Sequence, residues 1–201
     1  MEQSRFDKQL DFLIQIDRMK NIERQTLIAD GSRRETDAEH SWHIAVMAFL
    51  LKEYAVEPID VDRVVRMLLV HDLVEVYAGD TFCYDVQGNL DKKEREEAAA
   101  DRLFSMLPDD QRDEIRALFE EFDRMDTPDS RYAASLDRLQ PIINNHLTNG
   151  HTWRKGHVNS NQVFERMAPI KEATPSLWPL VEKIVAHGIE IGALVDGKEN
   201  G

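Results

Sequence analysis

Apolar side chains recur at helical spacing along most of the chain, and no segment keeps the strict alternation of a half-buried strand. Within residues 5–20, Phe6, Leu10 and Leu13 are separated by four and then three positions, which places them on one face of a helix. A second apolar stripe runs beside the first and consists of Phe12, Ile16 and Met19. The pattern predicts an all-α fold.

Start and stop signals divide this pattern into about seven helices. Thr36 and Glu39 have the spacing of a capping box, which predicts the start of a helix that runs to Leu50. Asp60 is placed to cap the next helix, and Gly79 is placed to end it in a left-handed conformation. Proline at the first helical position marks later starts at Pro108, Thr127-Pro128 and Thr174-Pro175.

The composition is that of a globular protein. The chain has 201 residues, of which 42% are hydrophobic and 31% charged, and this predicts one domain over residues 1–195 with a flexible tail over 196–201. No apolar run approaches the roughly 18 residues that span a bilayer, and the first residues do not resemble a signal peptide. The single cysteine, Cys83, excludes an intramolecular disulfide and favours a reducing compartment. A cytoplasmic location is therefore expected.

The formal charge of −13 disfavours a nucleic-acid polymer as partner, because binding to a phosphate backbone requires a basic surface. It does not disfavour a small phosphorylated substrate, which needs only a local cationic site. The segment Asp80–Leu90 lacks helical spacing and is expected to form a loop.

An adjacent pair, His71-Asp72, lies within the apolar segment Val64–Val76, which is predicted to be a single helix buried over most of its surface. Two polar groups in that position need partners, since burying them unpaired costs several kcal/mol. A metal ion is one partner that fits both, with His40 and Asp137 as further ligands. The alternative for His71 is a hydrogen bond to its neighbour or to an arginine, and His40 alone would be an ordinary packed or surface histidine.

Asp137 lies four residues before Pro141, whose ring is expected to bend the helix at residue 137. The alternative is a solvent-facing Asp137 paired with Arg138. Two imidazoles and two carboxylates suit one divalent ion, either Mn²⁺, Fe²⁺, Co²⁺, Ni²⁺, Zn²⁺ or, less well, Mg²⁺, and the ligand types do not choose among them.

Two further acids follow the His-Asp pair. Glu75 is four residues after His71 and shares its end of the helix, and Asp80 follows Gly79 where the loop begins. A metal with open positions, a carboxylate near its water and a second acid at the rim are the components of metal-assisted hydrolysis. A surface position is the alternative for Asp80.

The spaced set of acids and histidines resembles the HD-domain metal-dependent phosphohydrolases, and it consists of Glu39-His40, His71-Asp72, Glu75, Gly79-Asp80 and Asp137. Similarity to the 5′-deoxynucleotidase branch extends over Ala38-Glu39-His40-Ser41, Val76, Lys93-x-x-Glu96-Glu97-Ala98 and Leu136-Asp137-Arg138-Leu139. The resemblance covers about residues 5–195. It implies one divalent metal bound by His40, His71, Asp72 and Asp137, hydrolysis of deoxynucleoside 5′-monophosphates, and assembly as a homodimer.

Under that resemblance, Glu75 would orient the attacking water or take its proton, and Asp80 would assist the leaving oxygen or contact the sugar. Neutralisation of the phosphate charge is assigned to three basic residues that are otherwise unremarkable, Arg24, Arg33 and Arg34. The chain departs from the bacterial pattern at Gln25, where those enzymes carry the tryptophan that helps to select deoxyribose, and in the loop Thr81–Tyr84.

Two alternatives to a nucleotide phosphomonoesterase are considered. The first is a phosphodiesterase or a hydrolase of another phosphorylated metabolite, since the HD superfamily includes such enzymes. The second is a non-catalytic scaffold that binds a nucleotide or a partner. Glu75 and Asp80 disfavour the scaffold, because a binder needs no acid beside a water.

Overall fold

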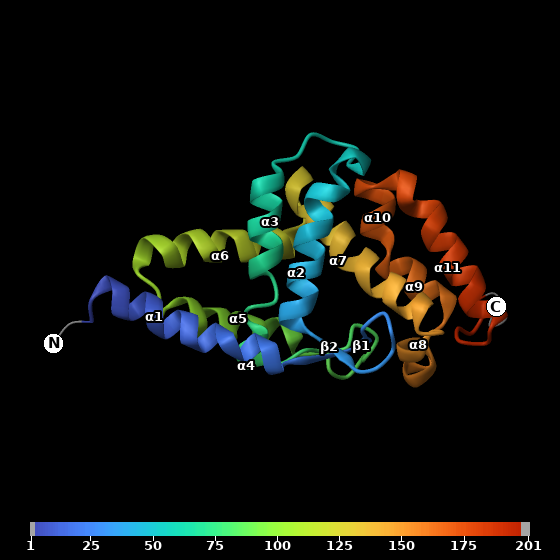
Figure 1. Ribbon diagram of the computed structural model, residues 1–201, viewed down its shortest axis with the longest axis horizontal. Coiled ribbons are helices and arrows are strands. Elements are labelled where there is room, and N and C mark those ends of the chain that lie inside the picture. Colours follow the sequence, from blue (N-terminus) through green and yellow to red (C-terminus); the bar gives the residue numbers. More distant parts are fainter. Residues whose placement is uncertain (1–2, 198–201) are drawn as a thin grey trace.

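The computed structural model describes residues 3–197 and is built almost entirely from helices (Figure 1). The α-helices are α1 (Arg5–Ile16), α2 (Asp37–Leu50), α3 (Val61–Val70), α4 (Glu75–Ala78), α5 (Lys92–Phe104), α6 (Asp109–Arg124), α7 (Pro128–Leu147), α8 (His151–Gly156), α9 (Ser160–Arg166), α10 (Ala168–Ala173) and α11 (Trp178–Glu190). Short 3₁₀ helices are η1 (Asp17–Asn21), η2 (Lys52–Tyr54) and η3 (Pro175–Leu177). The predicted all-α class is confirmed.

The predicted helix starts depend on local capping, and the structure contains those caps. The Thr36 hydroxyl accepts a hydrogen bond from the Glu39 backbone amide, and the Glu39 carboxylate accepts one from the Thr36 amide, as in a capping box. Thr127 caps α7 in the same way, with Pro128 at the first helical position. Gly79, at φ +75°, ends α4 in a conformation that glycine adopts without strain.

The core lies where α2 and α3 pack against the long helix α7. Ile44, Leu68 and Leu136, one from each of these helices, are completely buried. In Figure 1, α1, α5 and α6 extend to one side of this centre and α8 to α11 to the other. The site described below lies at the ends of α2 and α3 and beside the middle of α7.

The predicted number of helices was wrong, and a pair of short strands was missed. The described residues contain eleven α-helices rather than about seven, because short helices follow α7 and a separate turn forms α4. Two short antiparallel strands, β1 (Glu23–Leu27) and β2 (Arg34–Thr36), were not predicted. Strands of this length are too short to give a recognisable alternation.

The predicted continuous helix over residues 64–76 is also wrong. Helix α3 ends at Val70, and the following amides bond three residues back, as from Leu73 to the Val70 carbonyl and from Glu75 to the Asp72 carbonyl. Helix α3 is amphipathic rather than buried all round, since Leu69 remains 47% exposed. His71 and Asp72 therefore lie in a tightened turn at the end of a helix.

Three further predictions concern the loop over residues 80–90, membrane-spanning segments and the C-terminal tail. Residues 80–90 form the expected loop, without a helix or strand. Among residues 3–197, no helix is both long enough and apolar enough to cross a bilayer. At the end of the described chain, the Gly197 amide donates a hydrogen bond to Ser160, and residues 198–201 of the predicted tail lie outside the described part.

Candidate functional site

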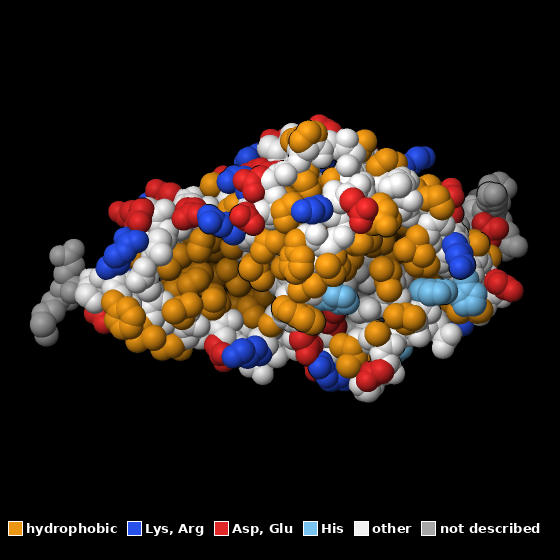
Figure 2. Space-filling model, turned by 45° about the horizontal axis from the view of Figure 1, so that its top comes forward, with side chains coloured by type: hydrophobic (Ala, Val, Ile, Leu, Met, Phe, Trp, Pro, Cys, Tyr) orange, Lys and Arg blue, Asp and Glu red, His pale blue; other side chains and the backbone are white. Residues whose placement is uncertain are grey.

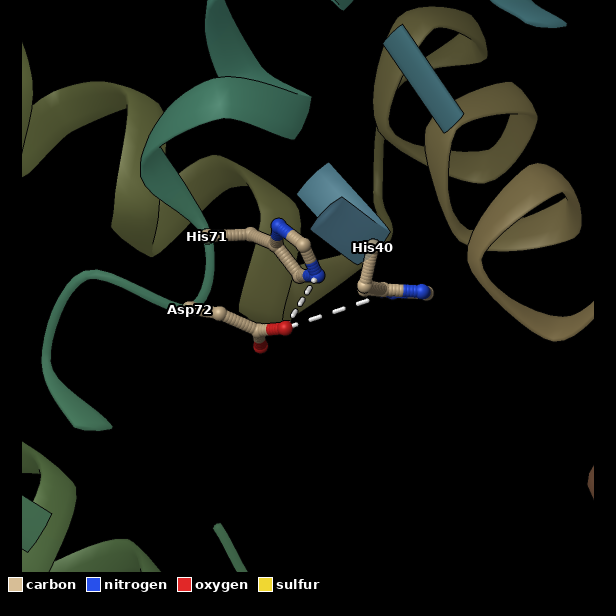
Figure 3. A group of neighbouring side chains, drawn as sticks. All are labelled: His40, His71 and Asp72. Atoms are coloured by element: carbon tan, nitrogen blue, oxygen red, sulfur yellow. Dashed lines mark ion pairs between the residues drawn. The ribbon is translucent and has the colours of Figure 1, made fainter. Parts of the chain in front are cut away.

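The structure brings the four predicted metal ligands together from three parts of the chain. His40 comes from α2, His71 and Asp72 from the turn after α3, and Asp137 from α7. Asp137 Oδ1 lies 2.8 Å from His40 Nε2 and 3.6 Å from His71 Nε2. Asp72 Oδ2 lies 3.1 Å from His71 Nε2 and 4.0 Å from His40 Nε2. In Figure 3 the Asp72 carboxylate faces both imidazole rings.

Hydrogen bonds on the far side of each imidazole determine its orientation. His40 Nδ1 lies 3.0 Å from Gln140 Oε1, and His71 Nδ1 lies 2.8 Å from the Leu68 carbonyl oxygen. Both acceptors favour a proton on Nδ1, which leaves the Nε2 lone pair directed at the carboxylates. The buried His71 Nε2 makes no hydrogen bond.

This donor set fits a divalent cation. Burial, followed by the Arg24 charge, holds the pKa of His40 well below its usual range, which favours the neutral imidazole that ligates metals. Burial would raise the pKa of Asp72, but His71 and Arg24 outweigh it and hold that pKa well below the usual range. A neutral His40 imidazole beside the ionised Asp72 carboxylate suits first-row metals.

Asp137 is buried, so the alternative of a solvent-facing carboxylate does not apply. Its Oδ1 faces the histidines, and its Oδ2 accepts a hydrogen bond from the neighbouring Arg138. Pro141 lies inside α7 and has no amide hydrogen for the carbonyl of residue 137. Asp137 thus faces the histidines, as expected for a metal ligand, and it also pairs with Arg138, as the alternative predicted. That pair lies within the buried site and not at the surface.

A second group of acids lies beside the first. Carboxylate oxygens of Asp37, Glu75 and Asp80 are all within 4.8 Å of one another. Asp37 Oδ2 and Glu75 Oε2 are buried without a hydrogen-bond partner. Burial, and then the neighbouring Asp72 and Asp37 charges, raise the pKa of Glu75 well above its usual value. Burial also raises the pKa of Asp80, and it raises that of Asp37 to about 6.

Two acids of this site, Glu35 and Asp37, were missed in the sequence. Glu35 accepts a hydrogen bond of 2.6 Å from Gln140 Nε2, so it supports the residue that orients His40. Burial raises the pKa of Glu35 to about 7. Both acids flank Thr36 within the capping sequence, where acidic residues are common for helix stability alone. Only the convergence of β2 and α2 with α7 distinguishes them.

The three predicted phosphate-binding arginines lie in different environments. Arg24, on β1, reaches the site, where its Nη1 lies 2.8 Å from Asp72 Oδ2 and 3.2 Å from Asp37 Oδ1. Burial opposes its charge, but Asp72, Glu75 and Asp80 together raise its pKa. Arg33 is exposed and forms a double hydrogen bond with Glu39 outside the site. Arg34 lies 3.8 Å from Glu23 at the surface, so neither Arg33 nor Arg34 enters the cavity.

A cavity of about 550 Å³ adjoins both groups of acids. Its polar lining includes Arg24, His71, Asp72, Glu75, Asp80, Lys92, Lys93, Glu96, Asp137, Arg138, Asn145 and Arg166. Its apolar and aromatic lining includes Phe82, Tyr84, Phe119, Phe122, Ile142, Trp153 and Val163. A volume of this size accommodates a small organic molecule, and the lining mixes apolar walls with convergent polar groups. Arg138 and Arg166 had not been assigned to substrate.

Comparison with known proteins agrees with this architecture. A family model of the HD domain matches residues 16–178. The chain is 30% identical over 135 residues to the 5′-deoxynucleotidase HDDC2 of Homo sapiens, covering 67% of this chain and 65% of that protein. It is 24% identical over 139 residues to the 5′-deoxynucleotidase hdd1 of Schizosaccharomyces pombe, covering 65% of this chain and 67% of that protein. The chain thus spans slightly less than two thirds of the human relative.

A solved structure matches over nearly the whole length. It is the crystal structure of a predicted metal-dependent phosphohydrolase from Magnetospirillum magnetotacticum MS-1, at 47% sequence identity and a TM-score of 0.90, and the match covers 96% of both chains. The family resemblance predicted from the spaced histidines and acids is confirmed by the family model and by these relatives. This chain belongs to the HD-domain family.

Proposed function

We propose that the protein is a metal-dependent phosphohydrolase that removes the 5′-phosphate from deoxynucleoside or ribonucleoside monophosphates. The proposal is carried by one observation: two oriented imidazoles and two carboxylates converge, with the buried His71 Nε2 unpartnered, next to buried acids at a cavity. His40, His71, Asp72 and Asp137 would hold one divalent cation. When bound, such a cation polarises a phosphate oxygen and lowers the pKa of a water molecule.

Glu75 is proposed as the residue that takes the proton of the attacking water. Its side chain is buried at the cavity wall, and its raised pKa makes the carboxylate a stronger proton acceptor than a solvated glutamate. The water oxygen attacks phosphorus as its proton passes to Glu75. The bond between phosphorus and the sugar oxygen breaks, which gives the nucleoside and inorganic phosphate.

Asp80 is proposed to protonate the leaving sugar oxygen. It lines the same cavity as Glu75, and its raised pKa favours the protonated form that donates. Asp80→Asn should therefore slow hydrolysis of a nucleoside monophosphate much more than hydrolysis of p-nitrophenyl phosphate, whose leaving group needs no proton. Equal slowing of both would instead indicate the sugar-contact role.

The substrate class comes from the relatives. Two are named 5′-deoxynucleotidases, and the cavity size suits a mononucleotide. The chain differs from the bacterial branch at Gln25, where that branch carries the tryptophan that helps to select deoxyribose. Gln25 lies at the cavity, and its side-chain oxygen accepts a hydrogen bond of 2.7 Å from Lys155. The loop that replaces the bacterial proline segment contributes Phe82 and Tyr84, whose rings pack edge to face with centroids 5.4 Å apart.

A phosphodiesterase or another phosphorylated-metabolite hydrolase is the second candidate, since the same centre would polarise a diester. A non-catalytic scaffold is less well supported, because a binding protein gains nothing from the buried, unpartnered Glu75 Oε2. The two enzymatic candidates differ in the substrate bond that is cleaved, so a substrate screen separates them.

The test combines metal analysis with phosphate release. Purified protein is stripped with a chelator, reloaded with each of the candidate metals, and assayed on all deoxy- and ribonucleoside 5′-monophosphates and on cyclic and linear diesters. We expect phosphate release from monoesters that requires metal, with one metal per chain. Hydrolysis of diesters without hydrolysis of monoesters would refute the monoesterase, and a metal-loaded protein inactive on every ester would refute both enzymes.

Asp72→Asn supplies the matching variant. It should lose the metal and at least about 10³-fold in kcat, because one charged ligand and its contacts with both imidazoles disappear. Asp62→Asn, which changes an exposed aspartate on the same helix, is the control and should remain active. A folded, metal-loaded and fully active Asp72→Asn protein would disprove the site assignment.

We also propose that the protein forms a homodimer through α1 and α2. Phe6, Leu13 and Ile14 on α1 and Trp42 on α2 are each more than half exposed, at 67%, 58%, 63% and 64%. Figure 2 shows apolar side chains gathered over this part of the surface. The first predicted stripe of α1 therefore faces outward, and it is the second stripe, with Phe12 and Met19, that enters the interior. Light scattering should give a dimer mass, and Ile14→Glu with Trp42→Glu should give a monomer.

A further inference from the structure

Cationic side chains at the cavity differ in whether they are already paired. Arg24 is bonded to Asp72 and Asp37, and Lys92 lies 3.4 Å from Glu96. Lys93 is solvent exposed. Arg138, on α7, donates to Asp137, whereas Arg166, at the end of α9, forms no ion pair with a carboxylate of the described residues. Both arginines line the same cavity.

We propose that Arg138 and Arg166 form an anion subsite that binds the phosphate of the substrate. The inference rests on the proposed phosphohydrolase function for the identity of the anion, and on the place of both side chains in the lining of one cavity for its position. Arg24, Arg33 and Arg34, which the sequence offered as neutralising the phosphate charge, are then not the principal phosphate ligands.

Arg138 connects this subsite to the candidate metal centre. One of its terminal nitrogens donates to Asp137 Oδ2, while Asp137 Oδ1 faces His40 Nε2. A guanidinium carries five donors, so several remain for a ligand in the cavity. An anion bound to Arg138 would therefore lie directly beside a proposed metal ligand, which is where a phosphate must lie to be hydrolysed.

Arg166 provides the unpaired charge. Within residues 3–197, no carboxylate forms an ion pair with Arg166, while the side chain lines the cavity and is only partly exposed. Arg138 carries a charge of the same sign and lines the same cavity. Two like charges in a partly buried cavity repel each other, and a bound dianion would remove this repulsion.

Phosphate fits this subsite better than a carboxylate does. Two guanidinium groups offer two sets of paired donors, which match the three terminal oxygens and double charge of a phosphate monoester. Tyr84 and Asn145 also line the cavity. Burial has the larger effect on the pKa of the Tyr84 hydroxyl and raises it, while the charges of both arginines act to lower it.

Inorganic phosphate is the probe for the test. Its affinity for the metal-loaded protein is measured by isothermal titration calorimetry in the wild type, Arg166→Gln, Arg166→Lys and Arg112→Gln. Arg112 is the control, an arginine on the outer surface of α6 whose ion pairs within the described chain are with Asp109 and Asp113. Metal content and circular dichroism are measured on every variant.

We expect Arg166→Gln to weaken phosphate binding by about tenfold or more, with unchanged metal content, because one charged pair of donors is lost. Arg166→Lys should fall between it and the wild type, since lysine keeps the charge and loses the paired donors. Arg112→Gln should bind phosphate like the wild type. For a hydrolysed monophosphate, KM should rise in Arg166→Gln.

Unchanged phosphate affinity in folded Arg166→Gln would overturn the subsite, even in a fully active enzyme. Conversely, a tenfold loss of phosphate affinity in a protein that hydrolyses no phosphate ester would support the subsite and refute the proposed function. If Arg166→Gln does not fold, a wild-type crystal soaked in phosphate decides the matter. Density between Arg138 and Arg166 supports the subsite, and density elsewhere in the cavity overturns it.

Discussion

The buried acids of the described chain form two groups that differ in their hydrogen bonding. Glu121 makes up the first group, and the acids of the candidate site make up the second. Glu121, on α6, is 6% exposed and has both oxygens bonded, one to Arg63 on α3 and the other to the Thr127 hydroxyl that begins α7. At the candidate site, Glu75 Oε2 and Asp37 Oδ2 are equally buried and have no hydrogen-bond partner.

The pKa directions express the same difference. Burial would raise the pKa of Glu121, but its bonds to Arg63 and Thr127 outweigh burial and lower it. At the site, burial dominates, and the pKa values of Glu35, Asp37 and Glu75 all rise. The acid that holds helices together has both oxygens bonded, whereas each of these site acids keeps one buried oxygen without a hydrogen bond, which costs stability and is typical of functional sites.

The largest effect that separates the two groups is expected for Glu75→Gln. Removing the proposed proton acceptor should lower kcat on the order of 10²–10⁴-fold. Because one carboxylate oxygen is buried without a hydrogen bond and like charges surround the group, the free energy of unfolding should stay the same or rise. Steady-state kinetics, metal analysis and urea unfolding of the same preparation measure all three quantities. An active but destabilised Glu75→Gln would make this acid structural.

Glu121→Gln should behave in the opposite way. The amide cannot reproduce the charged pair with Arg63, and the free energy of unfolding should fall by about 1–3 kcal/mol. Since Glu121 is not part of the cavity lining, kcat and metal content should equal those of the wild type. Urea unfolding with a parallel activity assay provides the measurement. A loss of activity in a stable variant would remove the distinction between the groups.

The pH dependence of unfolding should have opposite signs for the two groups. The folded-state pKa of Glu121 is lowered, so its contribution is present above the unfolded value of 4.5 and is lost as pH falls through the folded value. The pKa of Glu35 is raised from 4.5 to about 7, so its contribution to stability is present below pH 4.5 and is lost as pH rises toward 7.

The comparison is made with chelator-treated protein, so that metal occupancy does not contribute. Between pH 4.5 and 7, Glu35→Gln should gain stability relative to the wild type as pH increases. Glu121→Gln should approach wild-type stability as pH decreases below 4.5. Parallel stability profiles for the two variants would contradict the assignment of opposite pKa shifts.

The smallest effect is expected at Gln25, on the cavity wall proposed to contact the sugar. Gln25→Trp removes the hydrogen bond from Lys155 and installs the residue type found in the bacterial branch. The ratio of kcat/KM for deoxy- over ribonucleotides should rise several-fold, an effect of about 1 kcal/mol, without a change in unfolding. Lys155→Gln, which disrupts the same contact without adding an indole, is the control and should leave the ratio nearly unchanged.

Local signals in the sequence were sufficient for part of the fold. The capping box at Thr36 and the Thr127-Pro128 start depend only on nearby residues, and both are present. The four proposed metal ligands were found because their types and order match a family pattern. The break in the helix after Val70 was not found, because the apolar spacing continues through a turn whose amides bond three residues back.

The rest of the site depends on tertiary contacts. Glu35 matters because it reaches Gln140, more than a hundred positions away, and Arg166 matters because α9 places it at the cavity of Arg138. Neither pair has a characteristic spacing. In the sequence, Arg33 and Arg34 were as plausible as Arg24, and only the fold separates them, since it turns Arg33 toward Glu39 and Arg24 toward Asp72.

The most direct test of the account is the position of a bound ion. A crystal grown with Mn²⁺ and measured near the manganese absorption edge gives an anomalous peak wherever the ion lies. The account predicts a peak about 2.0–2.3 Å from His40 Nε2, His71 Nε2 and the carboxylates of Asp72 and Asp137. A peak held instead by Asp37, Glu75 and Asp80, or no peak at the histidines, would contradict it.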